Sequence, residues 1–320
     1  MLSRLPFALW PSPAGSLTIL IYHRVLPLPD PLRPGESHAA LFDRQMAMLA
    51  RRFKPMPLLQ AVQALREGRL HDRAVCVTFD DGYADNLTVA QPILARHGIP
   101  ATVFVATGYL DGGRMFNDAV IDAVAAAGGD ALDLRDQGLG LHPLGTVQQR
   151  RAAILQLLNQ LRYLPAAARE PKVASVIRAA GGRLLTAPPM LSTTQLRELA
   201  SRGVQIGGHT ISHTVLTSLS PAQAEAEIDG GRQHLQVLLD RPVREFAYPN
   251  GRPARDFDAS HAALIERLGF ALAVSTAPGA VTAASADCYQ LPRFTPWGSS
   301  VLALSARLAR NVRAGAATAS

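Results

Sequence analysis

The segment that most constrains the fold is residues 75–82, where an apolar, β-branched run ends abruptly at polar residues. Val-Cys-Val-Thr-Phe is followed directly by Asp80, Asp81 and Gly82. Such a run is typical of a buried strand in a parallel sheet, and its end brings both carboxylates to the sheet edge. Enzymes of the α/β class place their chemistry at that edge. The alternative is an ordinary strand-to-helix turn, because Asp and Gly are common turn residues.

A second polar constellation follows another short apolar run, residues 204–206. Residues 207–213 read Gly-Gly-His-Thr-Ile-Ser-His, which places His209 and His213 four residues apart. In a helix or a tight loop, two such histidines can bind one divalent metal ion. Two His and one Asp, with a position open to water, form a hydrolytic metal site. The alternative is a pair of structural histidines, but the Asp80–Asp81 strand end favours the metal site.

These two motifs resemble the first and second motifs of the NodB-type polysaccharide deacetylases, carbohydrate esterase family 4. The resemblance runs from about residue 17 to residue 294. It implies that Asp80 is the general base and that Asp81, His209 and His213 bind a divalent metal, usually Zn²⁺. It also implies an acetylated glycan substrate and an α/β fold, a distorted (β/α) barrel of about seven parallel strands.

The third family motif is matched in outline by residues 245–251, Glu-Phe-Ala-Tyr-Pro-Asn-Gly. The resemblance assigns Tyr248, Pro249 and Asn250 to a wall of the substrate groove. Tyr83 is a further candidate for substrate binding, and backbone N–H groups near it are candidates for oxyanion stabilisation. Aromatic rings can stack on sugar rings, and Tyr109 and Trp297 are further candidates for this contact. The alternative is that these aromatic residues pack in the core.

The chain departs from the family pattern at the residue that orients the base. Many members have an Arg shortly before the motif proline, and here Ala247 takes that place. Arg293, on another strand, is the candidate replacement, because a guanidinium beside Asp80 would keep the carboxylate ionised. An ordinary surface ion pair is the alternative for Arg293.

A second departure concerns the general acid. The family has a Leu-x-His after the last strand, whereas residues 274–276 here read Val-Ser-Thr. His23, which follows the strand predicted to begin at residue 17, is the candidate proton donor or substrate contact. The alternatives are that His23 merely ends the strand, that a metal ligand or water protonates the leaving group, or that activity is reduced.

The periodicity predicts a strand, a helix and a strand at residues 75–79, 86–97 and 101–105, a βαβ unit that fixes a parallel sheet. Residues 128–186 lack strand signals and predict a helical insertion, either a flap over the cleft or simple packing. Further helices and strands follow the apolar spacing. The predicted helices cover 42–53, 58–68, 119–127, 147–161, 171–180, 192–201, 220–240 and 261–268, and the predicted strands cover 17–25, 204–206 and 270–275. The organisation is then a segment at 1–16, a catalytic barrel at 17–306 and a tail at 307–320.

Composition sets outer limits. The 320 residues are 48% hydrophobic and 18% charged, which suits a globular protein with a large core. The net charge of +7 would suit binding to an anionic glycan, a membrane surface or nucleic acid. Because the charged residues form no basic run, we interpret the net charge as a solubility feature. Two cysteines are too few for a disulfide framework, and Cys76 is expected to pack as a free thiol.

Membrane and targeting signals are weak. The apolar piece near the beginning, residues 5–10, is shorter than a secretory signal needs, and no 18-residue apolar span occurs. The sequence therefore predicts no transmembrane segment and favours the cytoplasm.

The predicted function is metal-dependent removal of N-acetyl groups, with O-acetyl groups as a second option, from a polysaccharide or amino-sugar glycan in cell-surface or exopolysaccharide metabolism. Zn²⁺ would polarise the acetamide and lower the pKa of water toward roughly 7. Asp80 would take the water proton, and His23 would protonate the leaving amine. The rivals are a glycan-binding protein with weakened turnover, a metal-dependent phosphohydrolase and a nucleic-acid binder. The His-x-x-x-His spacing argues against the phosphohydrolase, and no interleaving of basic and aromatic residues supports the nucleic-acid binder.

Overall fold

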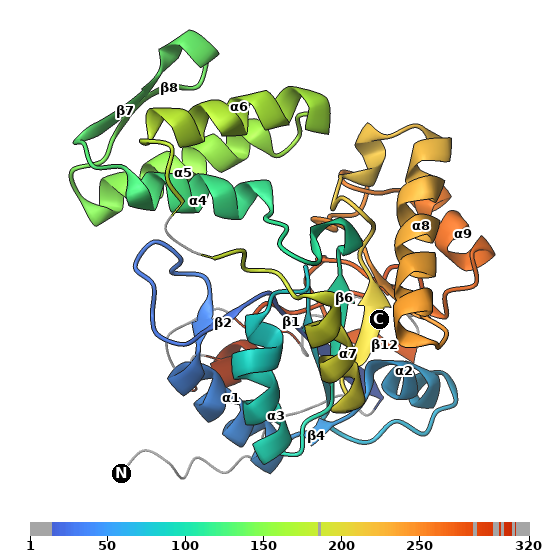
Figure 1. Cartoon of the computed structure of the whole chain (residues 1–320). Helices are drawn as coiled ribbons and strands as arrows, with labels where there is room; N and C mark the ends of the chain where they lie inside the picture. Colours follow the sequence, from blue (N-terminus) through green and yellow to red (C-terminus); the bar gives the residue numbers. More distant parts are fainter. Residues whose placement is uncertain are drawn as a thin grey trace, which may run out of the picture.

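A curled, mostly parallel sheet carries the fold. The computed structural model describes residues 15–184, 187–283, 287–296, 301, 304–308 and 311. Eight strands pair in the order β11-β10-β9-β6-β5-β1-β12, with β4 beside the start of β5, and only the β1–β12 pair is antiparallel. This α/β half-barrel, seen in Figure 1, confirms the predicted fold class. The strands are β1 (Ser16–Tyr22), β4 (Lys54–Pro55), β5 (Ala74–Phe79), β6 (Ala101–Val105), β9 (Gln205–Gly208), β10 (Glu245–Ala247), β11 (Leu272–Val274) and β12 (Val281–Thr282).

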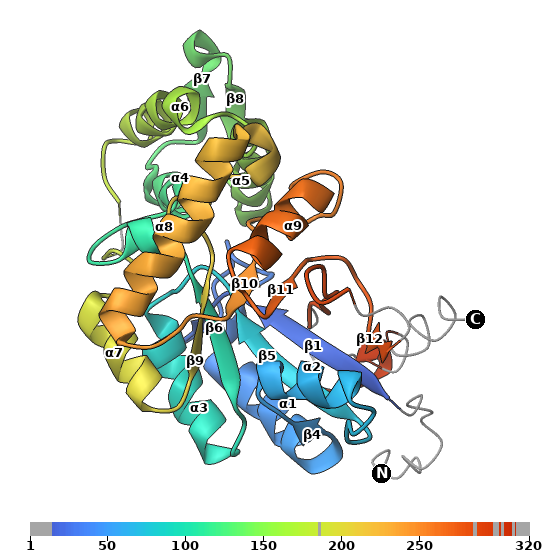
Figure 2. The ribbon, with the colours of Figure 1, turned by 90° about the vertical axis from the view of Figure 1, so that its right-hand side faces the viewer.

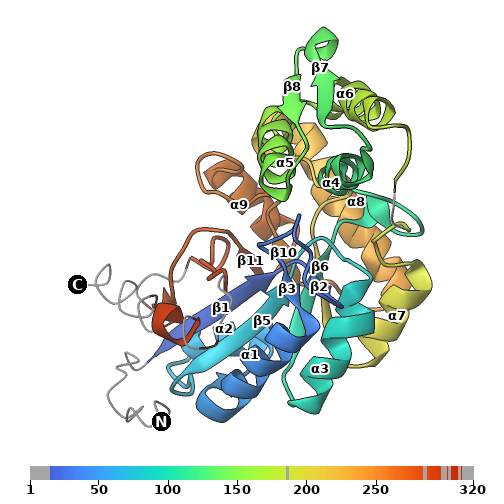
Figure 3. The ribbon, with the colours of Figure 1, turned by 90° about the vertical axis from the view of Figure 1, so that its left-hand side faces the viewer.

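Both faces of the sheet are covered, and its central strands β1, β5 and β6 are mostly apolar and fully buried for that reason. In β5, Val75 and Val77 pack on the outer side, whereas Ala74 and Cys76 face the inside of the curl. The thiol of Cys76 is buried there without a disulfide, as predicted. Figure 3 shows α1 and α3 covering β1 and β5, and Figure 2 shows α8 and α9 beside β9 to β11. The outer helices are α1 (Ala39–Arg52), α3 (Gln91–Arg96), α7 (Thr193–Ser201), α8 (Pro221–Leu239) and α9 (Ala259–Arg267).

Helix α2 (Leu58–Arg66) fills the inside of the curl at the end opposite the predicted site. Its Leu58 and Val62 pack against Leu17 and the inner side of β5. Glu245, at the beginning of β10, accepts a hydrogen bond of 3.1 Å from the backbone N–H of Leu59. The bottom of the barrel is therefore closed by a helix whose first turn is held by a buried carboxylate.

The predicted βαβ unit is present, but its helix is not continuous. A π-helical turn (Asn86–Ala90) precedes α3, and Pro92 lies in the first turn of α3. Because proline has no N–H to donate to the residue four before it, the regular hydrogen-bond ladder is interrupted there. Strand β9 extends past residue 206 through two glycines. Residue 207 must be a glycine because a Cβ there would lie 2.4 Å from a ring carbon of Phe104.

The insertion is a separate body with its own apolar core, seen above the sheet in Figure 1. Two features of the prediction are wrong. The segment contains an antiparallel hairpin. The sequence did not reveal it because each of its strands has at most two buried apolar positions, too few to show a period of two. The second helix begins five residues before Pro171, which lies inside it and not at its start. Helix α4 (Phe116–Ala126) precedes the insertion and shares its apolar core. The elements of the insertion are β7 (Ala131–Leu134), β8 (Gly140–Pro143), α5 (Val147–Leu161) and α6 (Ala166–Ala179).

The remaining elements are short, and the ends of the chain lie mostly outside the described residues. None of the described helices combines the length and apolarity needed to cross a membrane. The segment predicted at 1–16 is described only from residue 15, and the predicted tail only at Arg307, Leu308 and Asn311. The short elements are β2 (Val25–Leu26), β3 (Ser37–His38) and 3-10 turns at Thr107–Tyr109, Arg135–Gln137 and Leu216–Ser218.

The buried carboxyl of Glu245 makes a testable contribution to stability. Burial raises its pKa from 4.5 to about 7. Between these values the folded state holds a proton that the unfolded state has released, so the free energy of unfolding falls as pH rises. We expect Glu245→Gln to stabilise the protein more at pH 8 than at pH 5, by about 1–3 kcal/mol, in calorimetric unfolding. The exposed Glu170→Gln is the control, and an equal effect at both pH values would contradict the expectation.

Candidate active site

Three candidate metal ligands meet at the carboxyl edge of the sheet. Asp81 follows β5, and His209 follows β9. The Asp81 Oδ1 lies 3.4 Å from His209 Nε2 and 3.3 Å from His213 Nε2. Within the described part of the chain, this is the one group of His, Cys, Asp and Glu whose ligand atoms all lie within 4.8 Å of one another. The Asp81 Oδ1 is buried and accepts no hydrogen bond there, so it is free to bind a cation.

The protonation of the histidines suits a cation. The Nδ1 of His209 lies 2.7 Å from the carbonyl oxygen of Ala247. A carbonyl only accepts, so Nδ1 donates, and the lone pair of a neutral ring is left on Nε2 facing Asp81. Burial lowers the pKa of His213 to about 4, which keeps its ring neutral at higher pH. The three side chains can therefore hold a divalent cation with two nitrogens and one oxygen.

The backbone around these ligands is in an uncommon conformation. Asp81, Thr210 and His213 have φ angles of 75°, 65° and 54°, in the left-handed region that non-glycine residues seldom adopt. Such strain persists only where the surroundings fix it. Glu227 of α8 supplies this support, because its Oε2 accepts hydrogen bonds from the N–H groups of Ile211 and Ser212, at 3.0 and 2.8 Å. Sequence reasoning missed Glu227, since a lone Glu on a helix is ordinarily a solvated residue.

Asp80 is clamped by a buried arginine. Arg293 Nη1 and Nη2 each lie 2.7 Å from one oxygen of Asp80, and Arg293 is 1% exposed. Its Nε donates to the carbonyl of Ser275, and Nη1 donates to Thr78 Oγ1. Although burial raises the pKa of Asp80, Arg293 lowers it, and the net pKa lies below the usual value. The structure thus brings the predicted pair together, and the alternative of a surface ion pair for Arg293 is wrong because the pair is buried.

His23 lies at the same edge. It directly follows β1, whose last residue, Tyr22, pairs with Phe79 and accepts a hydrogen bond from the N–H of Asp80. The side chain is half-buried. Burial lowers the pKa of His23, but the charges of Asp81, Asp80 and Glu36 raise it above the usual value overall. The negative charges around His23 therefore favour the protonated form of its imidazole.

Two tyrosines of the predicted aromatic wall, Tyr83 and Tyr248, are buried in the described part of the chain. Tyr83 is 2% exposed and its hydroxyl donates to Asp118, while Tyr248 is 1% exposed and stacks on Phe257 with ring centroids 3.7 Å apart. Neither ring has a face open to a sugar, because both pack in the interior. Of the other residues predicted to form this wall, Pro249 is buried, Asn250 and Tyr109 are half-buried, and Trp297 lies outside the described residues.

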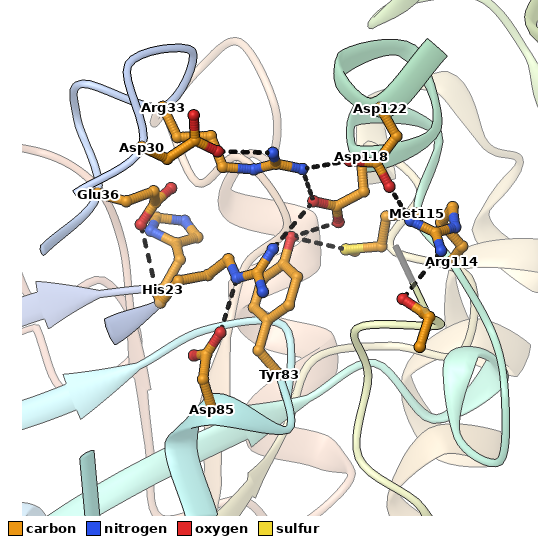
Figure 4. Close-up of polar contacts among 12 residues, drawn as sticks. His23, Asp30, Arg33, Glu36, Tyr83, Asp85, Arg114, Met115, Asp118 and Asp122 are labelled. Atoms are coloured by element: carbon orange, nitrogen blue, oxygen red, sulfur yellow. Dashed lines mark hydrogen bonds and ion pairs between the residues drawn. The ribbon is translucent and has the colours of Figure 1, made fainter. Parts of the chain in front are cut away.

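Above these residues lies a buried ionic network that the sequence did not reveal (Figure 4). Asp118 of α4 accepts from the Tyr83 hydroxyl at 2.8 Å and faces Arg24 and Arg33 at 3.5 and 3.3 Å. Arg24 also pairs with Asp85, at 2.8 Å. The network joins the loop of residues 27–36, the segment after β5 and the insertion. Its members are distant in sequence, so only the fold brings them together. The other members are Asp30, Arg114 and Asp122.

This chain is similar to known proteins in sequence and in fold. A family model described as "Polysaccharide deacetylase" matches residues 67–273. "Putative polysaccharide deacetylase YxkH" of Bacillus subtilis (strain 168) is 21% identical over 272 residues, covering 84% of this chain and 67% of the relative.

Two solved structures show the same fold. The deacetylase PplD of Streptococcus pyogenes, solved in complex with acetate, has a TM-score of 0.57 at 20% identity, covering 88% of this chain and 92% of PplD. IcaB from Ammonifex degensii has a TM-score of 0.56 at 18% identity, covering 93% of this chain and 97% of IcaB.

The ligand set predicts a metal affinity that can be measured directly. We expect chelator-treated protein to bind Zn²⁺ in calorimetry, and His213→Ala to weaken binding at least ~10-fold, about 1.4 kcal/mol. Binding should weaken as pH falls toward 4, because a protonated His213 cannot donate its lone pair. The exposed His234→Ala is the matched control. Unchanged affinity in His213→Ala would exclude this residue as a ligand.

Proposed function

The chain belongs to the polysaccharide deacetylase family, and we propose that it is a metal-dependent hydrolase that removes N-acetyl groups from an amino-sugar glycan. The observation that carries the proposal is the unpartnered Asp81 oxygen between two histidine nitrogens, beside the Asp80–Arg293 pair. The reaction cleaves the carbon–nitrogen bond of an acetamide and leaves acetate and a free amine. Acetyl esters of the same glycan are a second possible substrate, and cell-surface or exopolysaccharide material is the proposed source.

Asp81, His209 and His213 would hold the cation, and Zn²⁺ suits two imidazole nitrogens and a carboxylate. When bound, a divalent cation supplies Lewis-acid chemistry, polarising a carbonyl and making water easier to deprotonate. The protein supplies the geometry: His209 is oriented by the Ala247 carbonyl, and the loop with His213 is held by Glu227.

Asp80 is proposed as the general base. Its bidentate contact with Arg293 fixes the carboxylate, and the lowered pKa keeps it ionised and able to accept a proton from attacking water. The hydroxyl of that water joins the acetyl carbon. The role of the arginine that many family members have at the place of Ala247 thereby falls to Arg293, which lies 213 residues from Asp80 along the chain.

His23 is proposed as the general acid. As the carbon–nitrogen bond breaks, the amine nitrogen needs a proton, and His23 stands beside both carboxylates with a pKa raised above its usual value. The position after β11 where the family resemblance places an acid histidine is Thr276, a half-buried hydroxyl that donates to the carbonyl of Asn250 at 2.7 Å. His23 reaches the same edge of the sheet from the end of β1.

A second candidate is a glycan-binding protein with weakened turnover. The observation that favours it is Thr276 at the family's acid position, because its hydroxyl cannot donate a proton as an imidazolium does. This alternative requires glycan and metal binding without release of acetate, so a turnover assay separates the two functions.

The role of Asp80 can be tested by acetate release from N-acetylglucosamine oligomers with Zn²⁺ present. We expect Asp80→Asn to lower kcat at least ~100-fold, because an amide is no proton acceptor. The exposed Asp72→Asn is the matched control, and circular dichroism and Zn²⁺ binding check that the variant is folded. Metal binding without acetate release by the wild-type protein would favour the glycan-binding alternative.

The role of His23 predicts a dependence on the leaving group. An amine must be protonated to leave, whereas 4-nitrophenolate leaves as an anion. We therefore expect His23→Gln to lower kcat about 100-fold for N-acetylated oligomers and to leave hydrolysis of 4-nitrophenyl acetate nearly unchanged. The exposed His71→Gln serves as control. Equal losses on both substrates would assign His23 a different role.

A further inference from the structure

A pocket of about 400 Å³ lies beside His23, between the end of β1, the beginning of α1, the loop of residues 27–36 and the segment Thr295–Pro296. We propose that this pocket binds the sugar unit next to the one that carries the reacting acetyl group. The inference rests on the proposed function, because it extends the same site. Ligand pockets range over about 300–1,000 Å³, and this volume suits a ligand as small as a single sugar or a disaccharide.

The pocket meets the candidate active site at His23, the proposed general acid. His23 lines it, and the residue before, Tyr22, accepts the hydrogen bond from the N–H of Asp80. Glu36 also lines the pocket, and its charge acts on His23 together with those of Asp80 and Asp81. Figure 4 shows the Glu36 carboxylate beside the His23 ring. A chain occupying the pocket would therefore extend from the residues that carry out the reaction.

The wall contains polar groups that need a partner. Ser37 is 9% exposed, and its Oγ has no hydrogen-bond partner among the described residues. Helix α1 begins beside it, and its N-cap, His38, provides no side-chain hydrogen bond to the first turn. Oxygens of a ligand would satisfy the N–H groups of that turn, which no N-cap side chain satisfies, and an oxygen that reached the buried Ser37 hydroxyl would give it a partner. Sugar hydroxyl and ring oxygens are such acceptors.

The rest of the lining favours a neutral ligand over an anion. Arg24 and Arg33 line the pocket, but both already face carboxylates, and Asp30 is paired with Arg33. These side chains offer an anion no unpaired charge. Apolar surface from Leu41 and three prolines completes the wall and suits the C–H face of a sugar ring.

The pocket is formed in advance. Its loop is tied to α4 through Arg33, which contacts Asp118 and Asp122 at 3.3 and 3.0 Å. A wall held in place by a buried ionic network loses little further freedom when a ligand binds. The network thus keeps the pocket open and aligned with His23.

Gly35 allows the pocket to be filled without disturbing the backbone. It lines the pocket, its φ is not in the left-handed region, and an added Cβ would meet no atom within 4 Å. Gly128 also has no left-handed φ and room for an added Cβ, and it is an exposed residue of the insertion, far from Gly35 along the chain. Gly128→Trp is therefore the matched control. A second variant, Ser37→Ala, removes only the unpartnered hydroxyl.

Binding is measured first, by calorimetry with the metal-free protein and a tetramer of N-acetylglucosamine. We expect Gly35→Trp to weaken binding of the tetramer at least ~10-fold and Ser37→Ala to weaken it several-fold, with Gly128→Trp unchanged. The monomer should bind much more weakly than the tetramer. Equal affinity in the wild type and Gly35→Trp, or no binding of the tetramer by the wild type, would overturn the inference.

Turnover with Zn²⁺ separates this inference from the proposed function. We expect Gly35→Trp to lower kcat/KM for the tetramer at least ~10-fold while hydrolysis of 4-nitrophenyl acetate, too small to reach the pocket, stays unchanged. If the wild type releases no acetate but the binding difference persists, the deacetylase proposal fails and the pocket stands. An unchanged kcat/KM for the tetramer in Gly35→Trp would overturn the pocket.

Discussion

The contact between Asp80 and Arg293 is the interaction on which the rest of the site depends. An ionised carboxylate inside an apolar barrel is costly unless a counter-ion with good geometry satisfies it. Arg293 provides two hydrogen bonds to Asp80 and also donates to Ser275 and Thr78, so its donors join three segments of the interior. This clamp allows an acid to stand beside the candidate metal ligands without losing its charge, and removal of either partner would leave the other buried and unpaired.

Around that pair, strained backbone and buried ion pairs hold the candidate metal ligands and the neighbouring loops in place. The left-handed residues Asp81 and His213 turn their side chains toward a shared centre, and Glu227 holds the loop that makes this possible. Beyond them, Asp118 links Tyr83 to two arginines and so ties the insertion to the sheet edge. Buried ionic networks of this kind add little to stability over apolar packing, and we interpret this one as fixing geometry.

Much of this could be predicted because it is local. An apolar run that stops at Asp80 predicts a strand end whatever surrounds it, and Gly-Gly-His with a second His four residues later is equally self-contained. Predictions failed where local signals were weak or misleading. The hairpin at β7 and β8 has too few buried apolar positions to reveal its period. The sequence predicts that a helix begins at Pro171, whereas the helix begins at Ala166 and runs through this proline. For Tyr83 and Tyr248 the sequence left a groove wall and a core position as alternatives, and both rings are buried; a sequence does not show which side of a tyrosine is covered.

The sequence by itself determined the parallel sheet, the family and the residues that can hold a cation, since each follows from residue types at short spacing. Tertiary structure decided which distant side chains serve them. Arg293 reaches Asp80 across 213 residues, and Asp118 gathers partners from a loop and a turn, because only the curled sheet brings those segments to one edge. The physical reason is that hydrogen bonds and ion pairs depend on distance in space, and spacing along the chain fixes that distance only within one element or turn.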